Sequence, residues 1–124
     1  MTNTSTPRLS PQTEPYAAKG SAPKVMLTAQ QTVQSLEGDI YAILSYRPDK
    51  HVVTEQTFSN WIEQAAQTEW GTWEELATAM TDGFYDTALP LQMQLQLDIS
   101  EQDGITHSVT LTRCQPEKKE AVNG

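Results

Sequence analysis

Apolar and polar residues alternate along two neighbouring stretches near the C-terminus. Every second residue from Leu89 to Ile99 is apolar, and Gln or Asp fills most of the positions between them. From Ile105 to Thr112, Ile, His, Val and Leu alternate with Thr and Ser. Because successive side chains of a strand point to opposite faces, each stretch predicts a half-buried β-strand. Asp103-Gly104 suits a hairpin turn, since Gly adopts positive φ without steric cost. The pattern therefore predicts an antiparallel hairpin with one apolar and one polar face.

Two further strands are predicted earlier in the chain. Residues 24–33 alternate, with Val25, Leu27, Ala29, Gln31 and Val33 on one side. After a turn around Gly38, residues 40–46 form a short continuous apolar run, which is typical of a strand covered on both faces. Pro48 should end this strand, because proline has no N–H for the ladder.

Two helices are predicted between these strand pairs. Thr54 can cap the first, whose apolar face has the helical spacing i, i+3, i+4, i+7, i+8. Its members are Phe58, Trp61, Ile62, Ala65 and Ala66. Thr72 to Glu75 has the pattern of a capping box and predicts the start of the second helix. The second apolar face consists of Trp73, Leu76, Ala77, Met80 and Phe84. Gly83 predicts the end of this helix.

The predicted fold class is α+β, a two-layer ββααββ arrangement in which both helices cover one face of a four-stranded antiparallel sheet. Residues 24–113 form the single domain. Residues 1–23 are rich in Thr, Ser and Pro without an apolar period, so we expect a disordered tail, and 114–124 a flexible C-terminal tail. The polar face of the sheet is either open to water or lines an interior formed by several subunits.

The predicted domain is acidic. Between Val25 and Arg113 the chain has thirteen acidic residues and three basic ones, so this region carries a net charge of −10. Binding to a nucleic-acid backbone needs clustered Lys and Arg, so no nucleic-acid partner is expected. The acidity either serves solubility or favours a basic protein partner. No stretch reaches the roughly 18 apolar residues of a membrane span, and the N-terminus lacks the apolar core of a signal peptide, so we expect a cytoplasmic protein.

Three stretches carry a resemblance to a known family. They are an Ile-Tyr-x-x-x-Ser-Tyr strand ending in Pro-Asp (Ile40 to Asp49), a helix start led by Val53, and a Gly-x-aromatic-x-Glu turn (Gly71 to Glu75). They resemble the 7-cyano-7-deazaguanine reductases, the nitrile reductases of queuosine biosynthesis, over a little over half of the chain. The resemblance implies one subunit of the tunnelling fold, which pterin- and purine-handling enzymes share.

The chain departs from this family at its catalytic residues. The family's cysteine nucleophile lies upstream of the matching region, whereas the single cysteine here is Cys114. The family's lysine-containing motif for the nicotinamide cofactor falls on Thr54 to Ser59, which has no lysine, and its catalytic histidine falls on Glu74. Without a thiolate no covalent thioimide forms, so nitrile reduction by that route is excluded and no cofactor is expected.

Three residues are candidates for a ligand site. The resemblance implies that Glu75 grips the amide edge of a planar heterocycle, although it can equally serve as the capping-box carboxylate. Glu74 beside it suggests a carboxylate pair, but adjacent helical residues point about 100° apart, which favours a solvated pair. Trp70 lies outside both apolar helix faces and could stack on a ligand or partner. His51 and His107 have no partner at metal-ligand spacing, so no metal is expected.

Two classes of function follow. The first is a non-catalytic acidic binding or interaction protein on a tunnelling-fold-like scaffold, which associates with itself or with a basic protein. The second is a tunnelling-fold enzyme or ligand-binding protein that acts on a purine, deazapurine or pterin with carboxylates in place of the cysteine.

Overall fold

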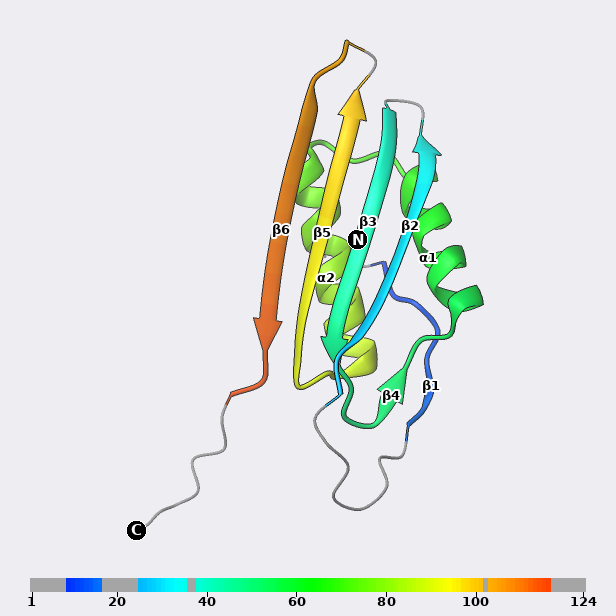
Figure 1. The fold of residues 1–124 in the computed structure, drawn as a ribbon, viewed down its shortest axis with the longest axis vertical. Coiled ribbons are helices and arrows are strands. Elements are labelled where there is room, and N and C mark those ends of the chain that lie inside the picture. Colours follow the sequence, from blue (N-terminus) through cyan, green and yellow to red (C-terminus); the bar gives the residue numbers. More distant parts are fainter. Residues whose placement is uncertain (1–8, 17–24, 36–37, 102, 117–124) are drawn as a thin grey trace, which may run out of the picture.

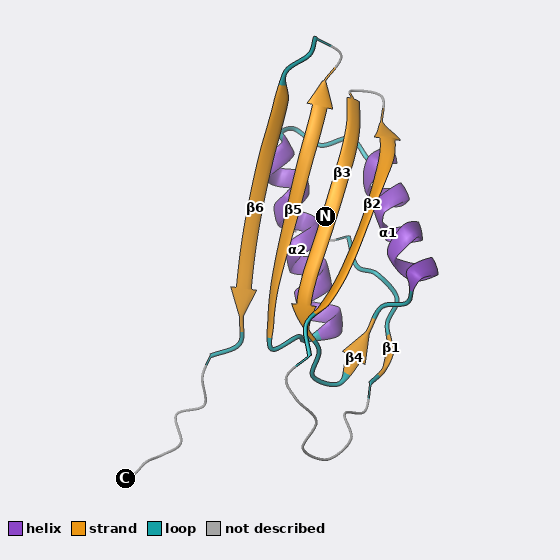
Figure 2. Cartoon of the chain, in the orientation of Figure 1, coloured by secondary structure: helices purple, strands orange, loops and turns teal. Residues whose placement is uncertain are grey.

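The computed structural model describes residues 9–16, 25–35, 38–101 and 103–116, and the fold is α+β. Four antiparallel strands in the order β2-β3-β5-β6 form one sheet, and both helices lie on one side of it (Figures 1 and 2). Two short strands, β1 and β4, pair separately. In chain order the elements are β1 (Glu14–Pro15), β2 (Leu27–Ser35), β3 (Gly38–Arg47), β4 (His51–Val52), α1 (Glu55–Gln67), α2 (Trp73–Ala88), β5 (Gln92–Glu101) and β6 (Thr106–Cys114). The structure thus confirms the α+β class with a four-stranded antiparallel sheet, while β1 and β4 add two short strands to the predicted ββααββ order.

The core lies between the sheet and the helices. The inward apolar residues of the two central strands are all buried, and Leu44 pairs with Leu95 in the middle of the sheet. They are Ile40, Ala42, Leu44, Tyr46, Met93, Leu95, Leu97 and Ile99. Burial alternates strictly along both strands, as the period-2 pattern requires.

The prediction that residues 40–46 are covered on both faces is wrong. Tyr41, Ile43 and Ser45 point away from the helices and are only partly buried. The apolar run instead reflects a central strand whose Tyr and Ile side chains suit a pleated, half-buried surface.

Helix α1 begins as its sequence predicts. The Thr54 hydroxyl accepts a hydrogen bond from the Thr57 amide, and the Thr57 hydroxyl accepts one from the Thr54 amide at 2.9 Å, which completes a capping box. The predicted apolar face is buried at Phe58, Trp61 and Ile62.

Helix α2 is longer than predicted. It starts after Thr72, whose hydroxyl accepts from the Glu75 amide at 3.1 Å, but it continues past Gly83 to Ala88. Leu89 ends it in the left-handed conformation, with φ of 50°. The period-2 pattern starting at Leu89 therefore overlaps the helix end, and β5 begins only at Gln92.

The prediction of a disordered tail over residues 1–23 is wrong for residues 9–16, which we call the N-terminal strap. Leu9 is buried against both helices, and β1 pairs with β4. Residues 1–8 and 17–24 lie outside the described residues. At the other end, Cys114 belongs to β6 and the Gln115 amide donates to the Leu91 carbonyl at 3.0 Å, while residues 117–124 lie outside the described residues.

Candidate functional site

One whole face of the four-stranded sheet lies on the side opposite the helices (Figure 1). We call it the open face. Strand register places mainly Thr, Gln and Ser on it, with Tyr41 and Ile43 near its middle. The only charged side chains among its described strand positions are Asp39, Arg47 and Asp98. The open face is thus polar but carries few charges, and antiparallel sheets commonly have one polar face opposite their apolar face.

Side chains of the open face are hydrogen-bonded to one another across the strands. Asp98 accepts from Ser108 at 2.7 Å and from Gln96 at 3.1 Å. The Tyr41 hydroxyl donates to the Gln30 side-chain carbonyl. These contacts hold polar side chains in place on a surface that no described helix or strand covers.

The two edge strands lack the usual features that block edge pairing. Strand β2 contains no charged residue and no proline, and β6 contains one permanent charge, Arg113, next to its end. Each pairs with its inner neighbour over nine consecutive residues without a bulge. Natural sheets normally protect such edges with Lys, Pro, bulges or short strands.

The acidic residues are concentrated on the helical layer instead. From Thr54 to Leu89 the chain has seven acidic residues and no basic one. Glu55, Glu63, Glu74 and Glu75 are exposed. The outer surface of the helices is thus strongly negative, whereas the sheet edges are nearly neutral.

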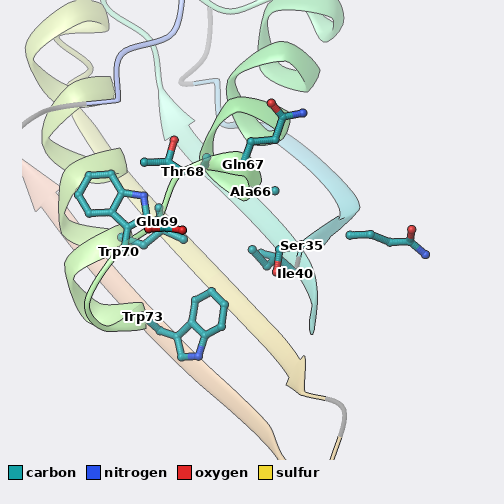
Figure 3. Close-up of a pocket in the computed structure, with 11 residues that line it drawn as sticks. Ser35, Ile40, Ala66, Gln67, Thr68, Glu69, Trp70 and Trp73 are labelled. Atoms are coloured by element: carbon teal, nitrogen blue, oxygen red, sulfur yellow. The ribbon is translucent and has the colours of Figure 1, made fainter. Parts of the chain in front are cut away.

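A pocket of about 790 Å³ opens where the α1–α2 turn faces the β2–β3 end of the sheet. Trp70 and Trp73 line it from the helical side, and Ser35 and Ile40 from the strands (Figure 3). Glu69 is the one acidic residue in its lining. The pocket therefore combines flat apolar surface with a few polar groups, which suits a small planar molecule.

The indole nitrogens of the two tryptophans differ in their partners. Trp73 Nε1 donates to Glu101 Oε2 at 3.1 Å, and His107 Nε2 lies 3.4 Å from the same oxygen. Trp70 Nε1 is buried and has no hydrogen-bond partner within the described part of the chain. A buried donor without an acceptor is costly, so a ligand or partner that supplied an acceptor would be favoured there.

The structure does not bring the three predicted site residues together in one site. Trp70 lines the pocket, while Glu74 and Glu75 are exposed on the first turn of α2 and do not line it. The Glu75 carboxylate lies back over Gly71, where an added Cβ would come within 2.6 Å of Oε1. The contact of Glu101 with Trp73 and His107 was not predicted from the sequence, and the register of the β5–β6 hairpin could have indicated only its His107 part.

Two classes of feature are absent from the described residues. No group of three or more His, Cys, Asp or Glu side chains there is arranged to hold a metal ion. Neither helix is long and apolar enough to cross a membrane.

No protein-family model and no curated protein sequence matches this chain.

Proposed function

We propose that this chain is a non-catalytic interaction protein of the tunnelling-fold type, which self-associates through the edges of its sheet. The observation that carries this proposal is the pair of unprotected nine-residue edge strands, β2 and β6, beside an open face that no element of the described chain covers. The sheet order β2-β3-β5-β6, with both helices on one face, supports the tunnelling-fold assignment.

Strand direction favours a head-to-tail association. Neighbouring strands alternate in direction, so β2 and β6 run opposite to each other across the four-stranded sheet. Placing β6 of one copy beside β2 of the next continues the antiparallel pattern and satisfies free backbone groups on both edges. Repeating this contact closes a ring if the rotation between copies permits it.

Charge favours the same arrangement. The acidic outer surface of α1 and α2 opposes helix-to-helix packing between copies, because like charges repel. The edge strands carry almost no charge, so pairing them brings no such repulsion. In the assembly the helices would lie outside in water, and the hydrogen-bonded Gln, Thr and Ser side chains would line the interior.

The absence of a nucleophile at the family's position supports a non-catalytic role. Cys114 is exposed at the last position of β6, on the open face and away from the pocket. The nitrile reductase route requires a thiolate close to the bound ring.

Edge variants test the proposal. Thr110→Lys places a charge in the middle of β6, and Thr78→Lys places the same charge on the exposed side of α2 as a matched control. Sedimentation velocity at micromolar concentration should show the parent and Thr78→Lys as assemblies and Thr110→Lys as a smaller species. A monomeric parent, or equal dissociation of both variants, would contradict the proposal.

A second candidate function, the binding of a purine, deazapurine or pterin, is favoured by the pocket that Trp70 lines, since Trp70 Nε1 has no hydrogen-bond partner among the described residues. A ligand that binds only the native state raises its melting temperature. We expect guanine or a pterin to do so in the parent, and Trp70→Phe, which keeps a ring but removes the N–H, to reduce the shift. Glu75 does not line this pocket, so Glu75→Gln should leave the shift unchanged and serves as a control. No shift with any of these compounds would remove this candidate.

A further inference from the structure

The N-terminal strap contacts both helices at Leu9, and we call the surface of α1 and α2 that Leu9 contacts the α1–α2 groove. Leu9 forms backbone hydrogen bonds with both helices at once. Its N–H donates to the Ala79 carbonyl of α2 at 3.3 Å, and its carbonyl accepts from Trp61 Nε1 of α1 at 2.7 Å. The groove therefore recognises the peptide backbone of its occupant, as well as the side chain.

Gly83 makes this close approach possible. A Cβ at this position would lie 2.0 Å from the Leu9 carbonyl oxygen. Glycine inside a helix is unfavourable compared with alanine, so its presence in the middle of α2 calls for a steric reason. The reason here is the passage of another backbone across the helix surface.

The strap offers two apolar side chains to the groove. Leu9 and Pro11 are buried, whereas Ser10 and Gln12 are exposed. The groove thus accommodates an extended Leu-x-Pro segment. Further along, the Tyr16 amide donates to the Lys50 carbonyl at 2.7 Å, and β1 pairs with β4.

The indole N–H of Trp61 gives the groove a hydrogen-bond donor for a peptide carbonyl. This side chain is 1% exposed, and its ring packs at 5.8 Å from that of Phe84. If the strap left, Trp61 Nε1 would lose the acceptor that Leu9 provides, and the apolar surface that Leu9 covers would be exposed. An empty groove is therefore unfavourable, and the same contacts are available to any chain that supplies the segment.

We propose that the α1–α2 groove is a docking site for an extended Leu-x-Pro peptide, and that the N-terminal segment of a second copy can replace the strap in it. The two backbone hydrogen bonds of Leu9 lie between the strap and the groove, so the same segment of another copy can make them. In the free chain the strap masks the groove, because a tethered ligand acts at an effective concentration on the order of millimolar. This docking site lies on the helical layer, so it is separate from the association of sheet edges proposed above.

A labelled synthetic peptide of residues 9–16 tests the proposal on the full-length chain by fluorescence anisotropy. The parent should bind it weakly, because the strap occupies the groove. Leu9→Ser weakens the contact between the chain's own strap and the groove. This variant should therefore bind the parent-sequence peptide at least ten-fold more tightly than the parent does. The double variant Leu9→Ser, Gly83→Ala should lose this binding, since the added Cβ blocks the site while favouring the helix. A peptide in which Leu9 is replaced by Ser should bind none of the chains.

Equal affinity of the parent and Leu9→Ser, or retained binding in the double variant, would overturn the proposal. Far-UV circular dichroism checks that each chain is folded. If Leu9→Ser loses its helical signal, the milder Leu9→Ala takes its place in the same comparison. Collapse of both would also overturn the proposal, because the strap would then be an inseparable part of the core.

Discussion

The rings of Tyr46 and Phe84 meet edge to face, with their centroids 4.9 Å apart, and so join the central strand β3 to α2. The Tyr46 hydroxyl also accepts a hydrogen bond from the Val53 amide at 3.1 Å, just before α1 begins. Burial raises the pKa of Tyr46, because the charged phenolate is poorly solvated in the core.

The raised pKa of Tyr46 predicts a loss of stability at alkaline pH. The folded state holds the phenol proton more tightly than the unfolded state, so this contribution is complete below about pH 10 and is lost as the pH rises further. Above about pH 10 we expect the free energy of unfolding of the parent to fall more steeply with pH than that of Tyr46→Phe. At neutral pH the variant should cost about 1–3 kcal/mol, since the Val53 amide loses its acceptor. Parallel pH profiles in urea titrations would contradict this.

Residues 94 and 95 test the two faces of the sheet. Leu95 is fully buried, so Leu95→Ala should cost about 2–5 kcal/mol. Gln94 is its neighbour on the open face and is exposed in the single chain, so Gln94→Ala should cost well under about 1 kcal/mol in a monomer. Chemical denaturation of both variants makes the comparison. Equal costs would mean that the open face is buried, as it would be inside an assembly.

Leu9 should contribute to stability although it lies outside the helices and the sheet. Leu9→Ala removes most of a buried side chain and should cost about 2 kcal/mol or more. Gln12→Ala, in the same segment but exposed, is the control and should change little. If the two variants were equally stable, the strap would not be held by Leu9.

Arg113 should matter little for folding. Its Nη1 lies 2.7 Å from Asp82 Oδ1 and its guanidinium lies 4.0 Å from the centre of the Tyr85 ring, but both charged side chains are partly exposed. Exposed ion pairs contribute about 1 kcal/mol or less. Thermal unfolding of Arg113→Ala should show only a small loss, and a loss of several kcal/mol would contradict the reading of this contact as a weak, exposed ion pair.

The elements that the sequence could predict depend on local patterns. Alternation along residues 89–111 predicted the β5–β6 pair, and Thr54 and Thr72 marked both helix starts, because strands and caps leave a local trace in the sequence. The end of α2 was predicted too early, because a glycine after an apolar helical pattern usually marks a helix C-terminus. Gly83 is needed because the backbone of Leu9 crosses α2 at this position, and Leu9 lies more than seventy positions away in the sequence.

The candidate site was predictable only in part. Trp70 stood out because it lies outside both helical faces, and it does line the pocket. Glu74 and Glu75 were chosen from the family resemblance, and their exposed positions depend on how α2 is oriented. The contact between Trp73 and Glu101 joins a helix start to a hairpin end, and no local pattern predicts such a contact.

The molar mass of the parent chain in solution tests the central claim most directly. Light scattering coupled to size exclusion, repeated over a dilution series, measures this mass without any substitution. Edge-to-edge association predicts a mass that is a whole multiple of 13.8 kDa and falls only on dilution. A constant mass of one chain at every concentration would contradict association through β2 and β6.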